Sequence, residues 1–190
     1  MITKLFLKAK HWQIFVLMFG MPILFELFVS GYIIEFLGSF SIAMLLMFLF
    51  ITMVLTWFWS IGVGLHKFLP VNYNLNLKKF KIFVFIPIVY TLILLFGTPI
   101  DGIINNLIIL SLHLFSMFCM FYMIYHCAKT IRSIEINKEA VFSDYVGEFF
   151  LLWFYIVGIW ILQPKIKKIY SDKENNPRDF KPEILTQTNE

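Results

Sequence analysis

The stretch "DYVGEFFLLWFYIVGIWILQPKIKKIY", residues 144–170, decides how this chain is organised, because it is apolar enough to enter a membrane yet ends in basic residues. Its uninterrupted apolar run, residues 149–162, would form about 21 Å of helix, short of a hydrocarbon core of about 30 Å. A full crossing would also carry three lysines to the far side: Lys165, Lys167 and Lys168. We therefore expect segment 145–163 to be a short re-entrant or interfacial helix that bends near Gly158.

The composition excludes a water-soluble domain. Of the 190 residues, 59% are hydrophobic, 19% aromatic and only 15% charged, so lipid must cover much of the apolar surface. A membrane helix needs roughly 20 mostly apolar residues. We expect an all-α integral membrane protein over residues 1–170 and a disordered tail over residues 171–190, which lack apolar periodicity. The four expected transmembrane helices are residues 12–34, 40–64, 82–96 and 107–128.

The basic residues predict the orientation. All sixteen Lys and Arg can be placed on one side of the four spans: three precede the first, four lie between the second and third, three follow the fourth, and six follow segment 145–163. Since Lys and Arg near span ends favour the cytoplasmic side, we expect both termini in the cytoplasm. These basic residues cluster beside apolar segments and do not cover one folded face, which argues against a nucleic-acid partner. The expected partner is the lipid bilayer.

Several stretches together resemble an uncharacterised family of small multi-pass bacterial membrane proteins. They are "GVGLHKFLP", "LNLKKFKIFVFIP", "LHLFSMF" and "FSDYVGEFFLLWFYIVGIWILQPKIKK", and the resemblance covers residues 57–168. It implies a location in the bacterial cytoplasmic (inner) membrane and a fold shared across the chain. The family has no assigned activity, substrate or binding residues to carry over.

Three polar residues within the expected spans fall at a similar depth. Each is counted from the lysine at the cytoplasmic end of its span. Glu26 lies sixteen residues after Lys10, His113 lies sixteen before Lys129, and Thr52 lies fifteen before Lys67. At 1.5 Å per residue these spacings are about 24 and 22 Å. An intramembrane carboxylate is expensive and needs protein or water around it, so Glu26, Thr52 and His113 are a candidate polar layer. A neutral, hydrogen-bonded Glu26 that fixes helix packing is the favoured interpretation. The alternatives are a proton-linked or ligand-binding role with His113 and a hydrated Glu26 close to the outer surface.

Sequence motifs for catalysis are missing. The chain has no H-E-x-x-H and no G-x-S-x-G, and "GVGLHK" has Lys67 where G-x-G-x-x-G requires glycine. One stripe on the fourth span would suit Cu(I), but Met packs well in apolar cores, and packing is the favoured interpretation. Its members are His113, Met117, Met120 and Cys127. We therefore predict no catalytic residues, no cofactor and no metal.

The ends of the spans carry further polar groups. His66 and His126 are expected to anchor the cytoplasmic ends of their helices, where the headgroup region favours basic side chains, and a shared site for an anion is the alternative. Glu148 is expected to pair with Lys165. Gly64, four residues after Ser60, is typical of a close helix contact.

These features predict a non-enzymatic protein. Four helices around one polar layer leave little room for a water-filled path, which favours an accessory or assembly subunit of a larger membrane complex, bound to other subunits or to further copies of itself. The first alternative is a small transporter or proton-coupled permease subunit that uses Glu26 and His113, and a membrane-embedded enzyme ranks third.

Overall fold

Every element that the structure describes is a helix. The computed structural model describes residues 2–70, 73, 75–96 and 103–175, excluding the side chains of residues 25, 26, 28–44, 96 and 103–105. The elements are α1 (Ile2–Lys8), α2 (His11–Phe15), the π-helix η1 (Val16–Gly20), α3 (Met21–Gly64), the 3-10 helix η2 (His66–Phe68), α4 (Leu77–Phe96), α5 (Ile103–Ile136), α6 (Phe142–Trp153) and α7 (Tyr155–Asn175). The expected all-helical class is confirmed for this part of the chain.

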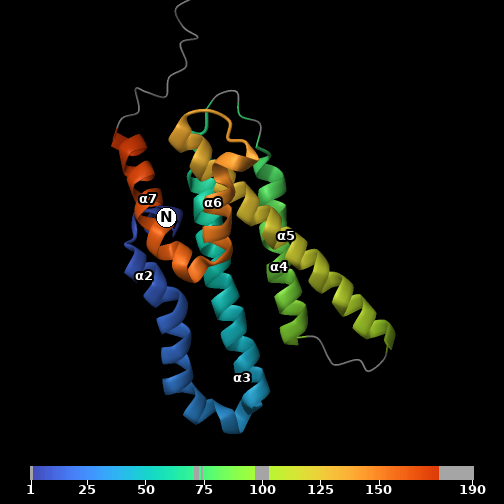
Figure 1. Ribbon diagram of the computed structural model, residues 1–190. Coiled ribbons are helices and arrows are strands. Elements are labelled where there is room, and N and C mark those ends of the chain that lie inside the picture. The colour runs from blue at the N-terminus through green and yellow to red at the C-terminus, as the bar shows by residue number, and fades with distance from the viewer. Residues whose placement is uncertain (1, 71–72, 74, 97–102, 176–190) are drawn as a thin grey trace, which may run out of the picture.

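The chain reverses direction within α3. The rings of Phe19 and Phe50 lie 5.6 Å apart, although a straight helix would separate them by about 46 Å. Figure 1 shows α2 descending and the second half of α3 returning beside it. Residues 35–39, expected as a connection between two spans, have helical backbone.

Helices α4 and α5 form an antiparallel pair. Phe83 packs on Tyr122 at 4.7 Å, and Tyr90 packs on His113 at 5.6 Å. Helix α5 continues unbroken to Ile136, so residues 129–136 are its last two turns. The helix ends before Asn137, whose φ of 52° is a left-handed conformation that asparagine tolerates.

Helices α6 and α7 form a hairpin over segment 145–163. The backbone leaves the helical region at Phe154, with φ −88° and ψ 55°, and α7 then folds back along α6 (Figure 1). The expected bend near Gly158 is therefore wrong by four residues. Gly158 is instead the contact point between the two helices: a Cβ there would lie 1.8 Å from the carbonyl oxygen of Leu151.

Helix α1 packs against the end of α3. It buries Leu7 at Gly64 of α3, where an added Cβ would lie 2.4 Å from a Leu7 methyl carbon, so Gly64 does mark a close helix contact.

The two ends of the described chain lie together. Helix α7 continues to Asn175. Residues 171–175 are therefore helical and not disordered as expected, because Glu174 binds Lys8 at 2.7 Å. This hydrogen bond with Lys8 also lowers the pKa of Glu174. Residues 176–190 lie outside the described chain.

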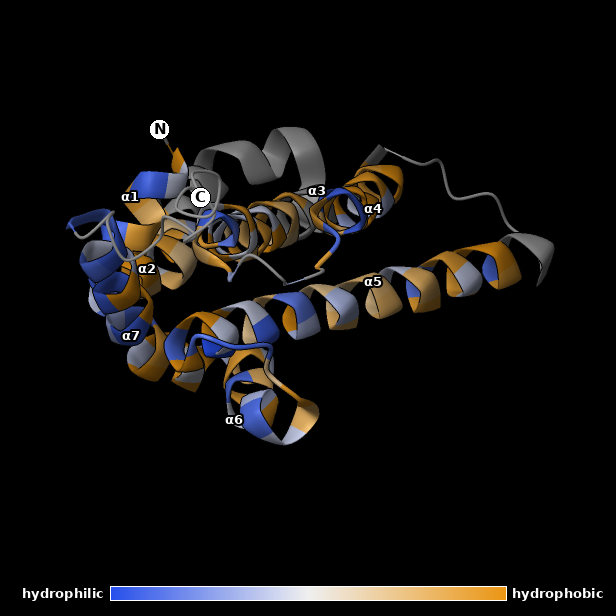
Figure 2. Cartoon of the chain, turned by 90° about the horizontal axis from the view of Figure 1, so that it is seen from above, coloured by the Kyte–Doolittle hydropathy of each residue, from blue (hydrophilic) through white to orange (hydrophobic). Residues whose placement is uncertain are grey.

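Two described stretches, Leu45–Phe68 and Asn106–Ile136, are long and apolar enough to cross a membrane. They contain the expected span 107–128 and most of the expected span 40–64. The expected span 12–34 corresponds to a described apolar helix, His11–Leu24, that is shorter than a membrane span. The expected span 82–96 belongs to α4, which begins with a cluster of lysines: Lys78, Lys79 and Lys81. Figure 2 shows that hydrophobic residues dominate α3, α4 and α5, whereas hydrophilic residues gather on α7. Of the four expected spans, two therefore correspond to described helices of spanning length.

Candidate functional site

The candidate polar layer is described only in part. The Glu26 side chain lies outside the described residues. Thr52 donates its hydroxyl hydrogen to the Phe48 carbonyl at 2.8 Å, within its own helix. His113 Nδ1 lies 3.1 Å from the Tyr90 hydroxyl. The layer therefore stays a prediction, and the partner that the structure gives His113 is Tyr90.

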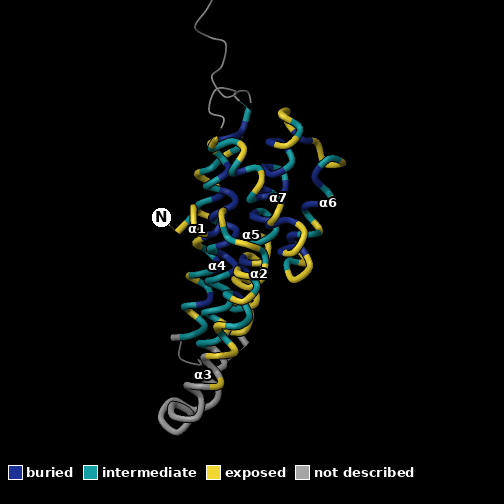
Figure 3. Tube along the Cα trace, turned by 90° about the vertical axis from the view of Figure 1, so that its left-hand side faces the viewer, coloured by how far each residue is buried: buried dark blue, intermediate teal, exposed yellow. Residues whose placement is uncertain are grey.

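His113 lies on a part of α5 that projects from the rest of the bundle. We call residues 106–118 the α5 arm. Every residue of the arm is exposed except Ile109, which is half-buried, and Ser116, which is buried. The buried residues gather elsewhere, toward the end of the molecule at which α1 lies (Figure 3). The Tyr90–His113 pair is thus a polar group on an exposed apolar surface, and we take it as the centre of the candidate site.

His126 does not lie at the surface, and its expected anchoring role is wrong. Its side chain is fully buried, with its ring 4.3 Å from the Phe80 ring and 6.3 Å from the His66 ring. Neither ring nitrogen of His126 has a hydrogen-bond partner among the described residues. Gly62 makes room for this arrangement, since a Cβ there would lie 2.2 Å from the Phe80 ring.

Gln163 is the polar residue that sequence reasoning missed. It is fully buried and joins three parts of the chain. Its Oε1 accepts from Trp57 Nε1 at 2.9 Å, and its Nε2 donates to the carbonyls of Phe6 at 2.7 Å and Ala9 at 3.1 Å. The sequence signal that could have identified Gln163 is an isolated amide side chain directly after the apolar run 149–162 and before Pro164.

The expected pair of Glu148 and Lys165 is confirmed at 2.7 Å. Lys165 also binds Glu135 at 2.8 Å, and Glu135 binds Arg132. Burial would lower the pKa of Lys165, but the hydrogen bonds that it donates to the two carboxylates outweigh this effect, so the pKa is raised. The cluster ties α5, α6 and α7 together at their polar end.

The stripe that would suit Cu(I) is divided between different environments. His113 is exposed, whereas Cys127 is buried and donates to the Phe58 carbonyl at 3.4 Å. Met117 and Met120 line an apolar cavity. Among the residues that the structure describes, no three His, Cys, Asp or Glu side chains are grouped so that they could hold a metal ion.

Comparison with protein-family models, with curated proteins and with solved structures finds no match to this chain.

Proposed function

We propose that this chain is a multi-pass protein of the bacterial inner membrane that serves as an accessory or assembly subunit of a larger membrane complex. It crosses the membrane four times, α6 and α7 enter and leave on the cytoplasmic side, and both termini are cytoplasmic. The observation that carries the assembly role is the Tyr90–His113 pair on the exposed α5 arm. The resemblance of residues 57–168 to small bacterial membrane proteins supports the location.

The exposed apolar surface supports a membrane environment. Large apolar side chains are exposed on every α-helix of the described chain, from Leu5 on α1 to Ile161 on α7. A soluble monomer rarely exposes contiguous apolar patches of this kind. Hydrocarbon covers such surfaces without penalty, and the helices satisfy their own backbone hydrogen bonds there.

The contact between the chain ends supports an even number of crossings. Because Lys8 and Glu174 lie 2.7 Å apart, α1 and the end of α7 belong on the same side of any membrane that the protein spans. A crossing by segment 145–163 would make the number of crossings odd if the other four segments all cross. The hairpin turn at Phe154 avoids this, and it leaves the lysines after the hairpin on the side that positive charge prefers.

The α5 arm supports a bound partner. Counted from Lys129, His113 sits about 24 Å along the helix, within the hydrocarbon region of the proposed orientation. Polar side chains in membrane helices almost always face protein or water, yet His113 is exposed. A helix of another subunit, or of a second copy of this chain, would remove the imidazole from lipid and offer it a second hydrogen bond, besides the one with the Tyr90 hydroxyl.

The proposed topology predicts the location of reporter fusions. An enzyme reporter that is active only outside the cytoplasm should be silent when fused at Glu190 and active when inserted within residues 97–106. Single cysteines at Ser143 and Lys168, in a chain lacking Cys119 and Cys127, should resist an impermeant thiol reagent on intact cells and react after lysis. We choose Lys168 because it is exposed. Labelling of position 168 alone from outside would show a fifth crossing.

The assembly role predicts a discrete crosslink from the α5 arm. A photoreactive amino acid at Leu110 should yield one defined adduct in native membranes, and His113→Leu should reduce that adduct about tenfold, as expected from the loss of about 1.4 kcal/mol of binding free energy. The matched control is the same photoreactive residue at Val157, which is exposed on α7 and should give only lipid adducts. Equal adducts from both positions, or a His113→Leu variant that crosslinks as well as the wild type, would contradict the proposal.

A further inference from the structure

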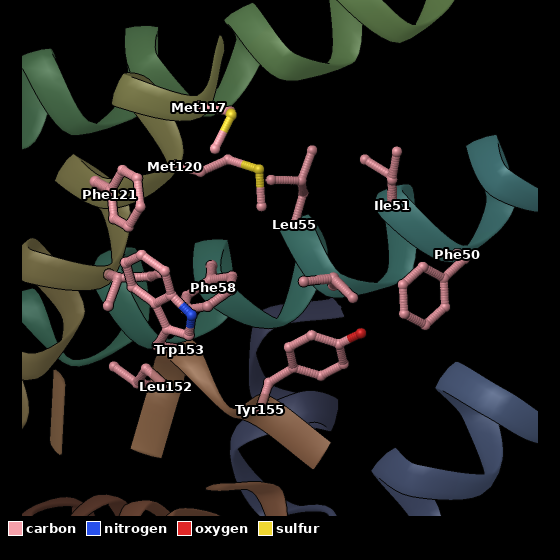
Figure 4. A pocket seen from close by; sticks show the side chains of 12 residues that line it. Phe50, Ile51, Leu55, Phe58, Met117, Met120, Phe121, Leu152, Trp153 and Tyr155 are labelled. Carbon is pink, nitrogen blue, oxygen red and sulfur yellow. The ribbon is translucent and has the colours of Figure 1, made fainter. Parts of the chain in front are cut away.

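We propose that the protein holds one acyl chain of a membrane phospholipid in an apolar cavity between α3, α5 and the α6–α7 hairpin. This inference rests on the proposed membrane location but not on the assembly role. The cavity has a volume of about 300 Å³, which is at the lower end of the range for small-molecule sites. Figure 4 shows side chains from the three sides converging on it, including Leu55, Met120 and Tyr155.

The lining of the cavity selects an apolar occupant. Twelve residues line it, and all are aliphatic, aromatic or methionine. The polar atoms that their side chains offer are the indole nitrogen of Trp153 and the hydroxyl of Tyr155. A buried water needs two to four polar partners, so this lining does not suit water. A flexible hydrocarbon chain fits such walls, and methionine side chains adapt to it readily.

The cavity has a buried floor and an exposed rim. Leu55, Phe58 and Leu152 at the floor are at most 2% exposed, whereas Met117 and Trp153 at the rim are 42% and 41% exposed. The opening therefore lies beside the outer surface of α5 and the tip of the hairpin. In the proposed orientation that surface faces lipid, so the nearest molecules able to enter are those of the bilayer.

The cavity lies at the depth of the hydrocarbon core in the proposed orientation. Its α5 wall runs from Met117 to Ile124, which are twelve and five residues before Lys129. Along the helix these distances are about 18 and 8 Å, and half of the hydrocarbon core is about 15 Å. Its α3 wall runs from Phe50 to Phe58, seventeen and nine residues before Lys67, which is about 26 and 14 Å along that helix. The cavity thus lies across the middle of the hydrocarbon core, where acyl chains and not headgroups are found. One acyl chain of a membrane phospholipid is the occupant that this geometry fits.

Native mass spectrometry of the full chain in a mild detergent tests the proposal. We expect one retained molecule with a phospholipid mass per protein chain. In the double variant Ile51→Trp with Met120→Trp, indole rings from opposite walls fill the cavity, and occupancy should fall at least about tenfold. The matched control, Ile93→Trp with Leu110→Trp, places the same rings at exposed sites on α4 and α5 and should retain the lipid.

A second measurement uses the unmodified protein. Delipidated wild-type chain is incubated in detergent with a phosphatidylglycerol that carries a photoreactive diazirine in its acyl chain. Adducts should map to residues 117–124 and 152–155 and should exceed those on the exposed residues 107–115. A wild-type protein without retained lipid, undiminished retention in the filled variant, a fatty-acid mass, or adducts spread evenly along α5 would overturn the proposal. The assembly role has its own test in the crosslink from Leu110, so the two can fail separately.

Discussion

Replacing Gly158 with alanine is expected to lower the free energy of unfolding by about 3 kcal/mol or more, at the upper end of overpacking effects. An ideal Cβ at this position would lie 1.8 Å from the carbonyl oxygen of Leu151 and 2.6 Å from its carbonyl carbon. Because these are backbone atoms, a change of rotamer cannot relieve the overlap, and α7 must move away from α6. That movement would also pull Lys165 from Glu148, which it binds at 2.7 Å.

The matched control is Gly147→Ala, for which we expect the opposite sign. Gly147 lies inside α6, and a Cβ there would meet no atom within 4 Å. Alanine should therefore stabilise the helix by about 0.5–1 kcal/mol. A thiol-reactive dye that reports the exposure of the buried Cys119 and Cys127 measures both variants during heating. Gly158→Ala should lower the midpoint by roughly 6–12 °C, and an unchanged midpoint would show that the helices do not meet at Gly158.

Replacing Gln163 with leucine is expected to destabilise the fold by about 3 kcal/mol, because two buried polar groups and one half-buried carbonyl lose their partner. Leucine preserves the approximate size but neither accepts from the Trp57 indole nor donates to the carbonyls of Phe6 and Ala9. The amide holds α7 to α3 and to the N-terminal segment at once. The same dye assay should show a midpoint lower by roughly 6–12 °C.

Two further variants separate the role of the Gln163 hydrogen bonds from a general effect of losing an amide. Gln13 is exposed and its Oε1 accepts from the Lys10 backbone at 2.8 Å, so Gln13→Leu should destabilise by only about 0.5–1 kcal/mol, as for a helix cap. Trp57→Phe removes the indole donor, so the Trp57→Phe, Gln163→Leu double variant should lose less than the sum of the single losses. Strict additivity would mean that the Trp57–Gln163 bond contributes nothing to stability.

Some tertiary contacts could be predicted from the sequence because they join residues on one hairpin. Glu148 and Lys165 are only seventeen positions apart, and the short apolar run between them already indicated that the chain turns back. When the chain turns back in this way, a lysine on the returning helix, here Lys165, is the expected partner of a carboxylate on the first helix, here Glu148. The close contact at Gly64 was also indicated, but α1, the helix that fills it, was not predicted.

Other parts of the candidate site depended on residues that are distant in sequence. Gln163 and Phe6 are 157 positions apart, and no local sequence pattern predicts that α1 will pack beside α7. His126 was expected at a headgroup surface, but Phe80 and His66 enclose it. The exposure of His113 likewise follows from how α5 leans away from the other helices (Figure 1) while keeping its contact with Tyr90 of α4, which the order of residues within α5 does not specify.

The sequence by itself determined the helical class and the positions of the apolar segments, and the placement of its Lys and Arg residues predicts an orientation. Helix length, apolarity and charge are properties of neighbouring residues, so they can be read without knowing the fold. Only the tertiary structure decided that the last apolar segment breaks at Phe154 and that Gly158 is a helix contact. A glycine can serve as a flexible joint or as a site of close approach, and the choice depends on the backbone that lies opposite it. Here that backbone is the Leu151 carbonyl, which the turn at Phe154 brings against Gly158.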